Sequence, residues 1–225
     1  MSSREKLKIS VDIALFLLLV FCMGFHLWGM LAHEIAGTAM LALLIVHNIL
    51  NRQWYKAIFR GRYSAMRLWL SVLVLLLLAA GLALAYSSEI ISKYVFAFLP
   101  DWGSRALAHR LHLWAAYWGM LLMSLHLGLH WGKFVHLGDF SGAVLHGKWL
   151  GIAAKIAALG IAAYGAYAFI ARNCLDYLLF RSAFFMFDRT ETAGGFYVDY
   201  LCMMGAGIFI SHYLAKVLRK IGGSI

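Results

Sequence analysis

Long apolar stretches separated by short polar or basic segments dominate this sequence. Runs such as residues 70–86 (LSVLVLLLLAAGLALAY) are long enough to cross a hydrocarbon core of about 30 Å as helices. The pattern predicts six membrane-spanning helices, at about 9–31, 33–52, 67–87, 105–131, 149–170 and 197–218. We therefore expect an all-α integral membrane bundle.

Composition and charge agree with a membrane protein and predict its orientation. The 225 residues are 63% hydrophobic and 13% charged, whereas soluble domains carry about 25% charged residues. With the N-terminus inside, thirteen lysines and arginines flank the inner helix ends and six flank the outer ends, which predicts cytoplasmic N and C termini. Because these residues flank apolar spans, the net charge of +10 does not indicate binding to nucleic acid.

Two of the predicted helices carry the same pair of histidines. His33 and His47 lie 14 residues apart on one helix, and His112 and His126 lie 14 residues apart on the other. Fourteen residues of α-helix return to nearly the same face and rise by roughly 21 Å. The two helices cross in the same direction, so His33 and His112 share a depth near the outer face, as His47 and His126 do near the inner face. Imidazole is a good iron ligand, and we predict two b-type haems, an outer one on His33/His112 and an inner one on His47/His126.

Neighbouring residues compete with these ligands or assist them. His109 is an alternative to His112, and His130 is an alternative to His126, but the equal spacing of the two pairs favours His112 and His126. His130 then has a role beside the ligands or at a propionate. Arg110 is either a propionate partner of the outer haem or an exposed interfacial arginine.

Several other polar residues have weaker signals. Glu34 is either a proton acceptor at a quinol site or part of a solvated helix end. His26 has no partner at ligand spacing and is predicted to be an interface residue. Purely structural histidines are the alternative to haem ligation, but polar groups are costly in lipid, and two matched pairs favour ligation. Cys174 and Cys202 either form a disulfide or, as we expect, remain free thiols.

The connecting segments are predicted to be short and interfacial. Residues 88–99 and 175–187 are apolar but too short to cross, and we expect the second to form an interfacial or re-entrant helix. Asp101 or Ser104 is predicted to cap the helix at 105–131.

The histidine pattern resembles that of a known family. The stretch His33–Glu34…Gly37…His47, its counterpart His112–His126, the outer RSAFFMFD stretch and the last span are similar to the flavinylation-associated cytochromes of bacteria. Tryptophan usually follows His-Glu in that family, and Ile35 takes its place here. The resemblance implies a dihaem protein of the bacterial cytoplasmic membrane that passes electrons from a quinol or a cytoplasmic donor to an extracytosolic, FMN-bearing flavinylated protein.

The expected organisation is a four-helix, cytochrome-b-like dihaem core in residues 1–135. Residues 136–225 would add two further transmembrane helices and an extracytosolic interfacial segment at about 172–199. Two axial imidazoles close the coordination sphere of iron, which favours electron transfer over oxygen chemistry. Whether the chain is part of an enzyme, as a subunit of an oxidoreductase complex, is not decided by the sequence.

Two other functions use the same histidines. Paired histidines at this spacing also occur in ferric reductases and NADPH oxidases, which carry a nucleotide-binding flavoprotein domain after the last span. No Gly-rich nucleotide-binding motif follows the last span here. The chain could therefore be a haem-bearing membrane subunit of this kind only with a separate flavoprotein. A di-iron oxygenase would need the histidines gathered on one side of the membrane. Here the two clusters are predicted near opposite faces, which disfavours that reaction.

Overall fold

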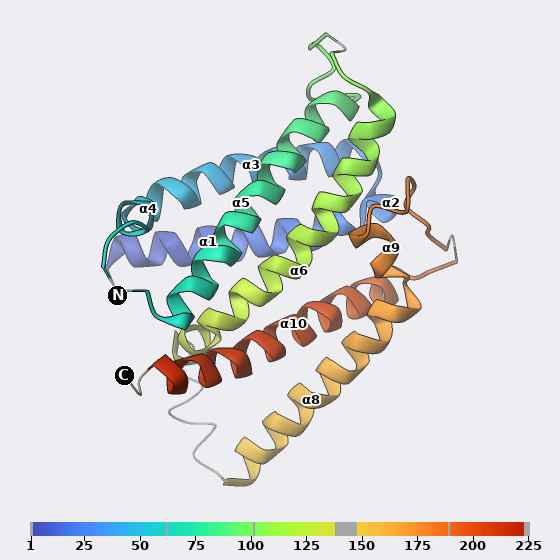
Figure 1. The fold of residues 1–225 in the computed structure, drawn as a ribbon. Helices are drawn as coiled ribbons and strands as arrows, with labels where there is room; N and C mark the ends of the chain where they lie inside the picture. Colours follow the sequence, from blue (N-terminus) through green and yellow to red (C-terminus); the bar gives the residue numbers. More distant parts are fainter. Residues whose placement is uncertain (1, 62, 101, 138–147, 189, 223–225) are drawn as a thin grey trace. The chain divides into compact units, whose positions relative to one another are not determined.

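The computed structural model of the chain is built from helices (Figure 1). It describes residues 2–61, 63–100, 102–137, 148–188 and 190–222, without the side chains of residues 133–137, 148, 221 and 222. Within these ranges every regular element is a helix: α1 (Ser3–Met23), α2 (Phe25–Trp28), α3 (Met30–Leu50), α4 (Arg52–Ala57), α5 (Ala65–Ile91), α6 (Arg105–Leu137), α8 (Lys148–Ala171), α9 (Cys174–Leu178) and α10 (Ala193–Gly222). The prediction of an all-α fold is confirmed for this part of the chain.

Among the residues that the structure describes, four helices are long and apolar enough to cross a membrane. They are α3, α5, most of α8 and α10 as far as Lys220. Their length and composition suggest a multi-pass membrane protein in a lipid bilayer. Helices α1 and α6 are also long, with 21 and 33 residues, but charged residues and histidines lower their mean hydropathy.

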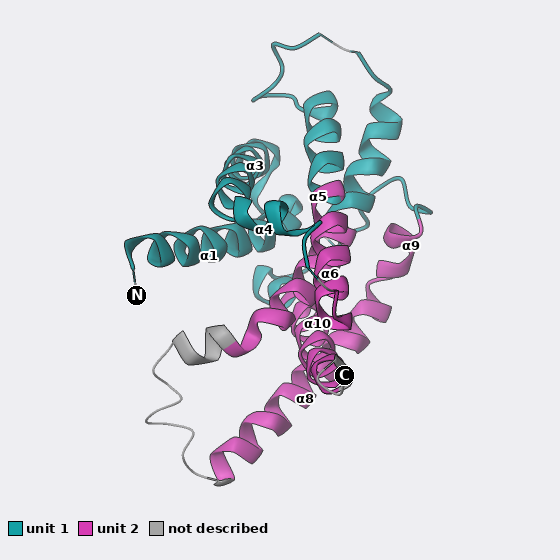
Figure 2. Ribbon diagram, turned by 60° about the vertical axis from the view of Figure 1, so that its left-hand side comes forward, with its two compact units in different colours: residues 1–62, 80–116, 180–197 teal, residues 63–79, 117–179, 198–225 magenta. Residues whose placement is uncertain are grey.

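The chain divides into two compact units, shown in different colours in Figure 2. Unit 1 comprises residues 1–62, 80–116 and 180–197, and unit 2 comprises residues 63–79, 117–179 and 198–225. Helices α5 and α6 each contribute residues to both units. These boundaries differ from the division into residues 1–135 and 136–225 that the sequence suggests.

In unit 1, α1 and α3 pack against each other as a helical hairpin. The hydroxyl of Ser2 accepts a hydrogen bond from the Glu5 backbone N–H, and the Glu5 carboxylate accepts one from the Ser2 N–H, which caps α1. One apolar face of α1 is buried, with a residue on each turn: Val11, Leu15, Leu19 and Met23.

Glycines end the first arm of this hairpin and begin the second. Helix α1 stops at Met23, and Gly24 donates its N–H to the carbonyl of Phe21. Gly29 takes a φ of 83°, a left-handed conformation in which glycine meets no steric penalty, and α3 begins at the next residue. The predicted span at about 9–31 is therefore not one continuous helix, because the break at Gly24 interrupts it.

The connections at residues 88–99 and 175–187 are less helical than the sequence predicts. Within 175–187 only α9 is helical, so the prediction of a helix as far as residue 187 is wrong. Phe180 takes a φ of 59°, and an α-helix does not continue through a left-handed residue. In the other segment, 88–99, α5 continues to Ile91 and the remainder is irregular.

Two smaller predictions are confirmed. The hydroxyl of Ser104 accepts a hydrogen bond from the Leu107 N–H at 3.4 Å and so caps α6; Asp101 lies outside the described residues. All the cysteines are free thiols: Cys22, Cys174 and Cys202. The buried Cys174 thiol donates to the Met203 sulfur at 3.6 Å instead of forming a disulfide.

In unit 2, glycine allows the helices to approach closely. A Cβ at Gly165 of α8 would collide with the backbone carbonyl of Cys202 in α10, and one at Gly205 would lie 2.6 Å from Ile161 Cγ2. Close approach through small residues is the usual way in which helices pack inside membranes. An apolar cluster in this unit is formed by the buried side chains of Leu73, Leu122, Leu129 and Ala215.

Candidate haem-ligand site

The two predicted ligands of the outer haem come together in unit 1. His33 in α3 and His112 in α6 have ring centroids 5.8 Å apart, with their planes inclined at 67°. A metal–imidazole bond is about 2.1 Å long, and a five-membered ring with C–N bonds of about 1.33 Å places its nitrogens about 1.1 Å from the centroid. Two imidazoles on opposite sides of one metal therefore have centroids about 6.4 Å apart. The observed separation is about 0.6 Å shorter.

Two serines at the end of α5 orient the ring of His112. The hydroxyls of Ser87 and Ser88 lie 3.3 Å and 3.4 Å from its Nδ1. Ser87 donates its own proton to the Ala83 carbonyl at 2.7 Å, so it accepts from the Nδ1–H of His112. In that tautomer Nε2 has the lone pair and is the ligating atom. Neither serine was predicted from the sequence to contact a ligand.

The ring of His33 has a different environment from that of His112. Nδ1 of His33 is buried and has no hydrogen-bond partner among the described residues. A buried ring nitrogen left without a partner costs free energy, and a metal ion would supply that partner. A Cβ added to Gly37, one turn along α3, would meet nothing within 4 Å in the described structure.

Arg110 lies two residues before His112 and is half-buried, which disfavours the alternative of an exposed interfacial arginine. Its Nη2 donates to the Phe180 carbonyl at 2.7 Å, and its guanidinium lies 4.6 Å from the centroid of the Phe180 ring. Its Nε is buried and finds no acceptor among the described residues. One strong donor of this guanidinium is therefore available for a carboxylate.

His47, the predicted inner ligand on α3, is paired with a carboxylate. Its Nδ1 lies 2.7 Å from Oδ1 of Asp12 in α1. The two side chains are 30% and 35% exposed. Such a pair fixes the tautomer and orientation of an imidazole. The other ring nitrogen of His47, Nε2, lies 3.5 Å from the side-chain nitrogen of Asn51. Asp12 was not among the predicted site residues, although an acid within an apolar stretch of helix is a signal of function.

The remaining candidate ligands lie on α6. His109 is exposed, and His112 is the residue beside His33, as the equal-spacing argument predicts. The rings of His126 and His130 lie 5.0 Å apart in unit 2. His47 belongs to unit 1, so the pairing of His47 with His126 stays a prediction, and His130 stays its alternative.

The carboxylate of Glu34 fixes the loop that follows α5. It accepts hydrogen bonds from the Ser92 hydroxyl at 2.7 Å and from the backbone N–H groups of Lys93, Tyr94 and Val95 at 2.8, 3.0 and 2.9 Å. Because one carboxylate has about four acceptor positions, these bonds occupy it. The geometry favours an anchoring role over either role considered for Glu34 from the sequence.

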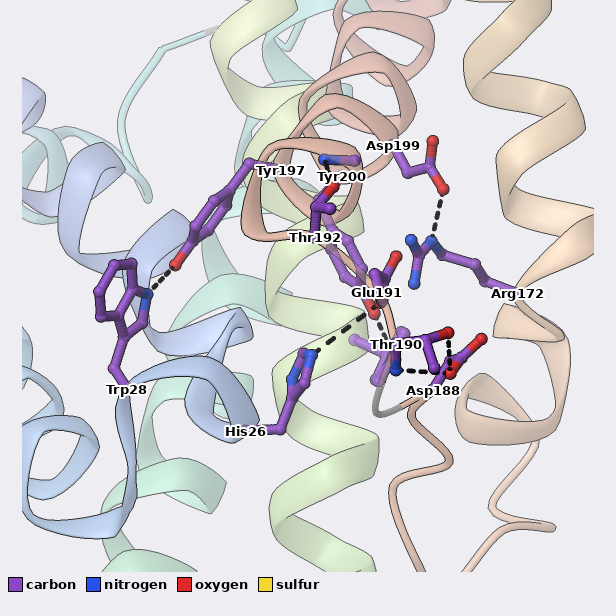
Figure 3. A network of polar contacts seen from close by, with 12 residues as sticks. His26, Trp28, Arg172, Asp188, Thr190, Glu191, Thr192, Tyr197, Asp199 and Tyr200 are labelled. Carbon is purple, nitrogen blue, oxygen red and sulfur yellow. Dashed lines mark hydrogen bonds and ion pairs between the residues drawn. The ribbon is translucent and has the colours of Figure 1, made fainter.

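The side chain of His26, in α2, is also buried (Figure 3). It is 4% exposed and lies 4.0 Å from the carboxylate of Glu191, a partner that the sequence did not predict. Beside it, the indole N–H of Trp28 donates to the Tyr197 hydroxyl at 2.7 Å. The ring of His26 also packs among phenylalanines: Phe185, Phe187 and Phe196. These contacts attach residues 180–197 to α2.

Comparisons of the chain with protein-family models, with curated proteins and with solved structures found no match. In the part of the chain that the structure describes, no three or more histidine, cysteine or acidic side chains gather as a metal-ion cage. A bis-histidine haem uses two protein ligands and would not form such a group. The candidate site thus depends on the geometry of His33 and His112.

Proposed function

We propose that this protein conducts electrons across a membrane through two bis-histidine b-type haems. The observation that carries the proposal is the 5.8 Å separation of the His33 and His112 rings. Those residues come from helices far apart in the sequence, and they were predicted to pair from spacing alone. Each haem, when bound, supplies a one-electron carrier.

The residues around this pair fit a haem. The buried Nδ1 of His33 and the buried Nε of Arg110 have no partner among the described residues, and iron and a propionate are partners of the right kind. The serine contacts leave Nε2 of His112 as a ligand. In this proposal His33 and His112 hold the outer haem, and Arg110 binds one of its propionates.

The proposal extends to the rest of the chain. His47 and His126 hold the inner haem, and six spans, with α1 and α6 added to the four most apolar helices, leave both termini in the cytoplasm. The residues themselves orient the ligands and exclude water, while a quinol or a cytoplasmic donor supplies electrons. The acceptor is an extracytosolic flavinylated protein, which the family resemblance supports.

The experiment that tests this proposal measures haem per chain in the purified protein, together with a reduced-minus-oxidised spectrum. We expect two low-spin b haems. His33→Ala and His112→Ala should each lose the same haem, and His47→Ala and His126→Ala should each lose the other, so that the content falls from about two to about one.

His109→Ala and His130→Ala are matched controls, because each removes a neighbouring imidazole from the same helix α6. Both controls should retain two haems. Absence of haem from the wild-type protein would refute the proposal. Loss of the same haem in His33→Ala and His126→Ala would refute the pairing of ligands.

A further inference from the structure

The short helix α4 begins at the end of a candidate membrane span. Helix α3 has 21 residues, which is about 31 Å of helix and close to the thickness of a hydrocarbon core. It ends at Leu50, and α4 starts two residues later at Arg52 (Figure 1). With α3 across a bilayer, α4 therefore lies at the depth of the lipid headgroups.

Side-chain contacts fix α4 to the α1–α3 hairpin within unit 1. The Tyr55 hydroxyl donates to the side-chain oxygen of Asn48 in α3. The Lys8 ammonium of α1 donates to the side-chain oxygen of Asn51, just before α4, at 2.9 Å. Trp54 and Tyr55 are both half-buried. Because one side of α4 is held in this way, its other side chains face outward.

The outward side chains of this segment are cationic. Arg52 and Lys56 lie one turn apart on α4, Arg60 follows in the turn after it, and all three are exposed. Like charges one helical turn apart repel each other. The sequence has no acidic residue between Glu34 and Glu89, and no described carboxylate forms an ion pair with these three side chains. The segment therefore favours an anionic partner outside the chain.

Carboxylates on α1 do not balance these cations. Glu5 and Asp12 lie on α1, but so do Arg4, Lys6 and Lys8. Together with the three cations of residues 52–60, six cations and two carboxylates give this end of the hairpin a net charge of +4. The excess of positive charge persists whatever hydrogen bonds these groups form.

A phenylalanine in the same turn identifies the kind of anion. Phe59 lies beside Arg60 and is 94% exposed. An aromatic ring left in water forgoes the free energy of burial, which acyl chains would restore. A soluble anion would neutralise the cations but would not cover this ring. Basic residues next to an exposed aromatic residue are typical of segments that lie in the membrane interface.

We infer that residues 52–60, the α4 site, bind anionic phospholipid. Arg52, Lys56 and Arg60 bind the headgroup phosphates, and Phe59 inserts among the acyl chains. The predicted orientation places this end in the cytoplasm, where basic segments meet the anionic leaflet. The inference goes beyond electron conduction and does not depend on either haem.

The test is native mass spectrometry of the purified full-length chain in detergent. Phosphatidylglycerol and phosphatidylcholine with the same acyl chains are added separately, and the dissociation constants of the first bound lipid are compared. Each cation near an anionic membrane surface strengthens association by a factor of about five, so we expect wild type to bind phosphatidylglycerol at least about tenfold more tightly. Arg52→Gln/Lys56→Gln/Arg60→Gln should lose most of this preference.

Lys216→Gln/Arg219→Gln/Lys220→Gln is the matched control. It removes three exposed cations from the end of another candidate span, α10. It should keep the lipid preference of wild type. Arg52→Lys/Arg60→Lys retains the charge of the α4 site and should keep the preference too. Circular dichroism should show the helical content of wild type in every variant.

Phe59→Ser distinguishes a lipid from a soluble anion with the same charge. Loss of the ring should weaken binding of phosphatidylglycerol by at least about tenfold. Glycerophosphoglycerol, which is the headgroup without acyl chains, should not displace the lipid.

Three results would overturn the inference. One is equal affinity of wild type for the two lipids, and another is an equal loss of preference in the α4 and α10 triple variants. The third is a site for a soluble anion, shown by unchanged lipid binding in Phe59→Ser or by displacement of the lipid with the free headgroup. Absence of haem from wild type would refute the proposed function and leave this inference intact.

Discussion

Gly165 lies where α8 packs on α10, and replacing it with alanine tests the packing of unit 2 without reference to any cofactor. The added methyl group would collide with the backbone carbonyl of Cys202. A backbone carbonyl cannot rotate away as a flexible side chain can, so the two helices must separate or tilt. Gly160, on the same helix, has nothing within 4 Å of an added Cβ in the described structure and provides the matched control.

The expected magnitude follows from this contrast. Forcing a methyl group into a packed interface costs about 1–3 kcal/mol. Both substitutions gain the helix propensity of alanine over glycine, about 1 kcal/mol, and this gain cancels when the variants are compared. We therefore expect Gly165→Ala to be about 2 kcal/mol less stable than Gly160→Ala. For a chain of this size that difference corresponds to a melting temperature about 4–8 °C lower.

The assay is thermal unfolding of both variants in the same detergent, followed by circular dichroism. Haem content is measured in parallel, so that loss of a ligand is not mistaken for loss of packing. Equal melting temperatures for Gly165→Ala and Gly160→Ala would refute the close approach of α8 and α10 at Cys202. A lower melting temperature in Gly160→Ala alone would refute it as well.

Two further predictions concern the Glu34 carboxylate and the Cys174 thiol. In Glu34→Ala the three backbone N–H groups and the Ser92 hydroxyl lose their common acceptor. Because water partly replaces that acceptor, the free energy of unfolding should fall by about 1–2 kcal/mol. The backbone amides of residues 92–96 should exchange hydrogen faster, and unchanged exchange would contradict the anchoring role. Burial raises the pKa of the Cys174 thiol to about 12, so the thiol stays protonated at pH 8. Iodoacetamide should therefore label Cys174 in SDS but not in the folded protein, and equal labelling rates in both would refute its burial.

The sequence predicted the features that depend on local periodicity. The register of His33 and His112 follows from the regular rise of a helix, and the structure brings these two rings together. The serine contacts of His112 and the carboxylate partner of His47 depend on which helices become neighbours. Spacing within one helix therefore could not reveal Asp12, since its partner is 35 residues away.

The errors have a similar origin. An apolar run predicted a helix through residue 187, but hydrophobicity does not report backbone conformation, and Phe180 adopts a left-handed one. His26 appeared unpartnered because Glu191 and the surrounding phenylalanines come from a distant segment. In both places the outcome was decided by tertiary contacts of residues 180–197.

The hairpin of α1 and α3 also has a consequence for how the chain enters the bilayer. In the proposed six-span arrangement, α1 on its own would expose Lys8 and Asp12 to hydrocarbon, which makes it a poor membrane segment. In the hairpin, Lys8 bonds to Asn51 and Asp12 to His47, so each arm covers polar groups of the other. The two arms are joined by only a short turn, and contacts between residues close in sequence form early. We therefore expect α1 and α3 to insert as one pair during synthesis, with α3 drawing its more polar partner into the membrane.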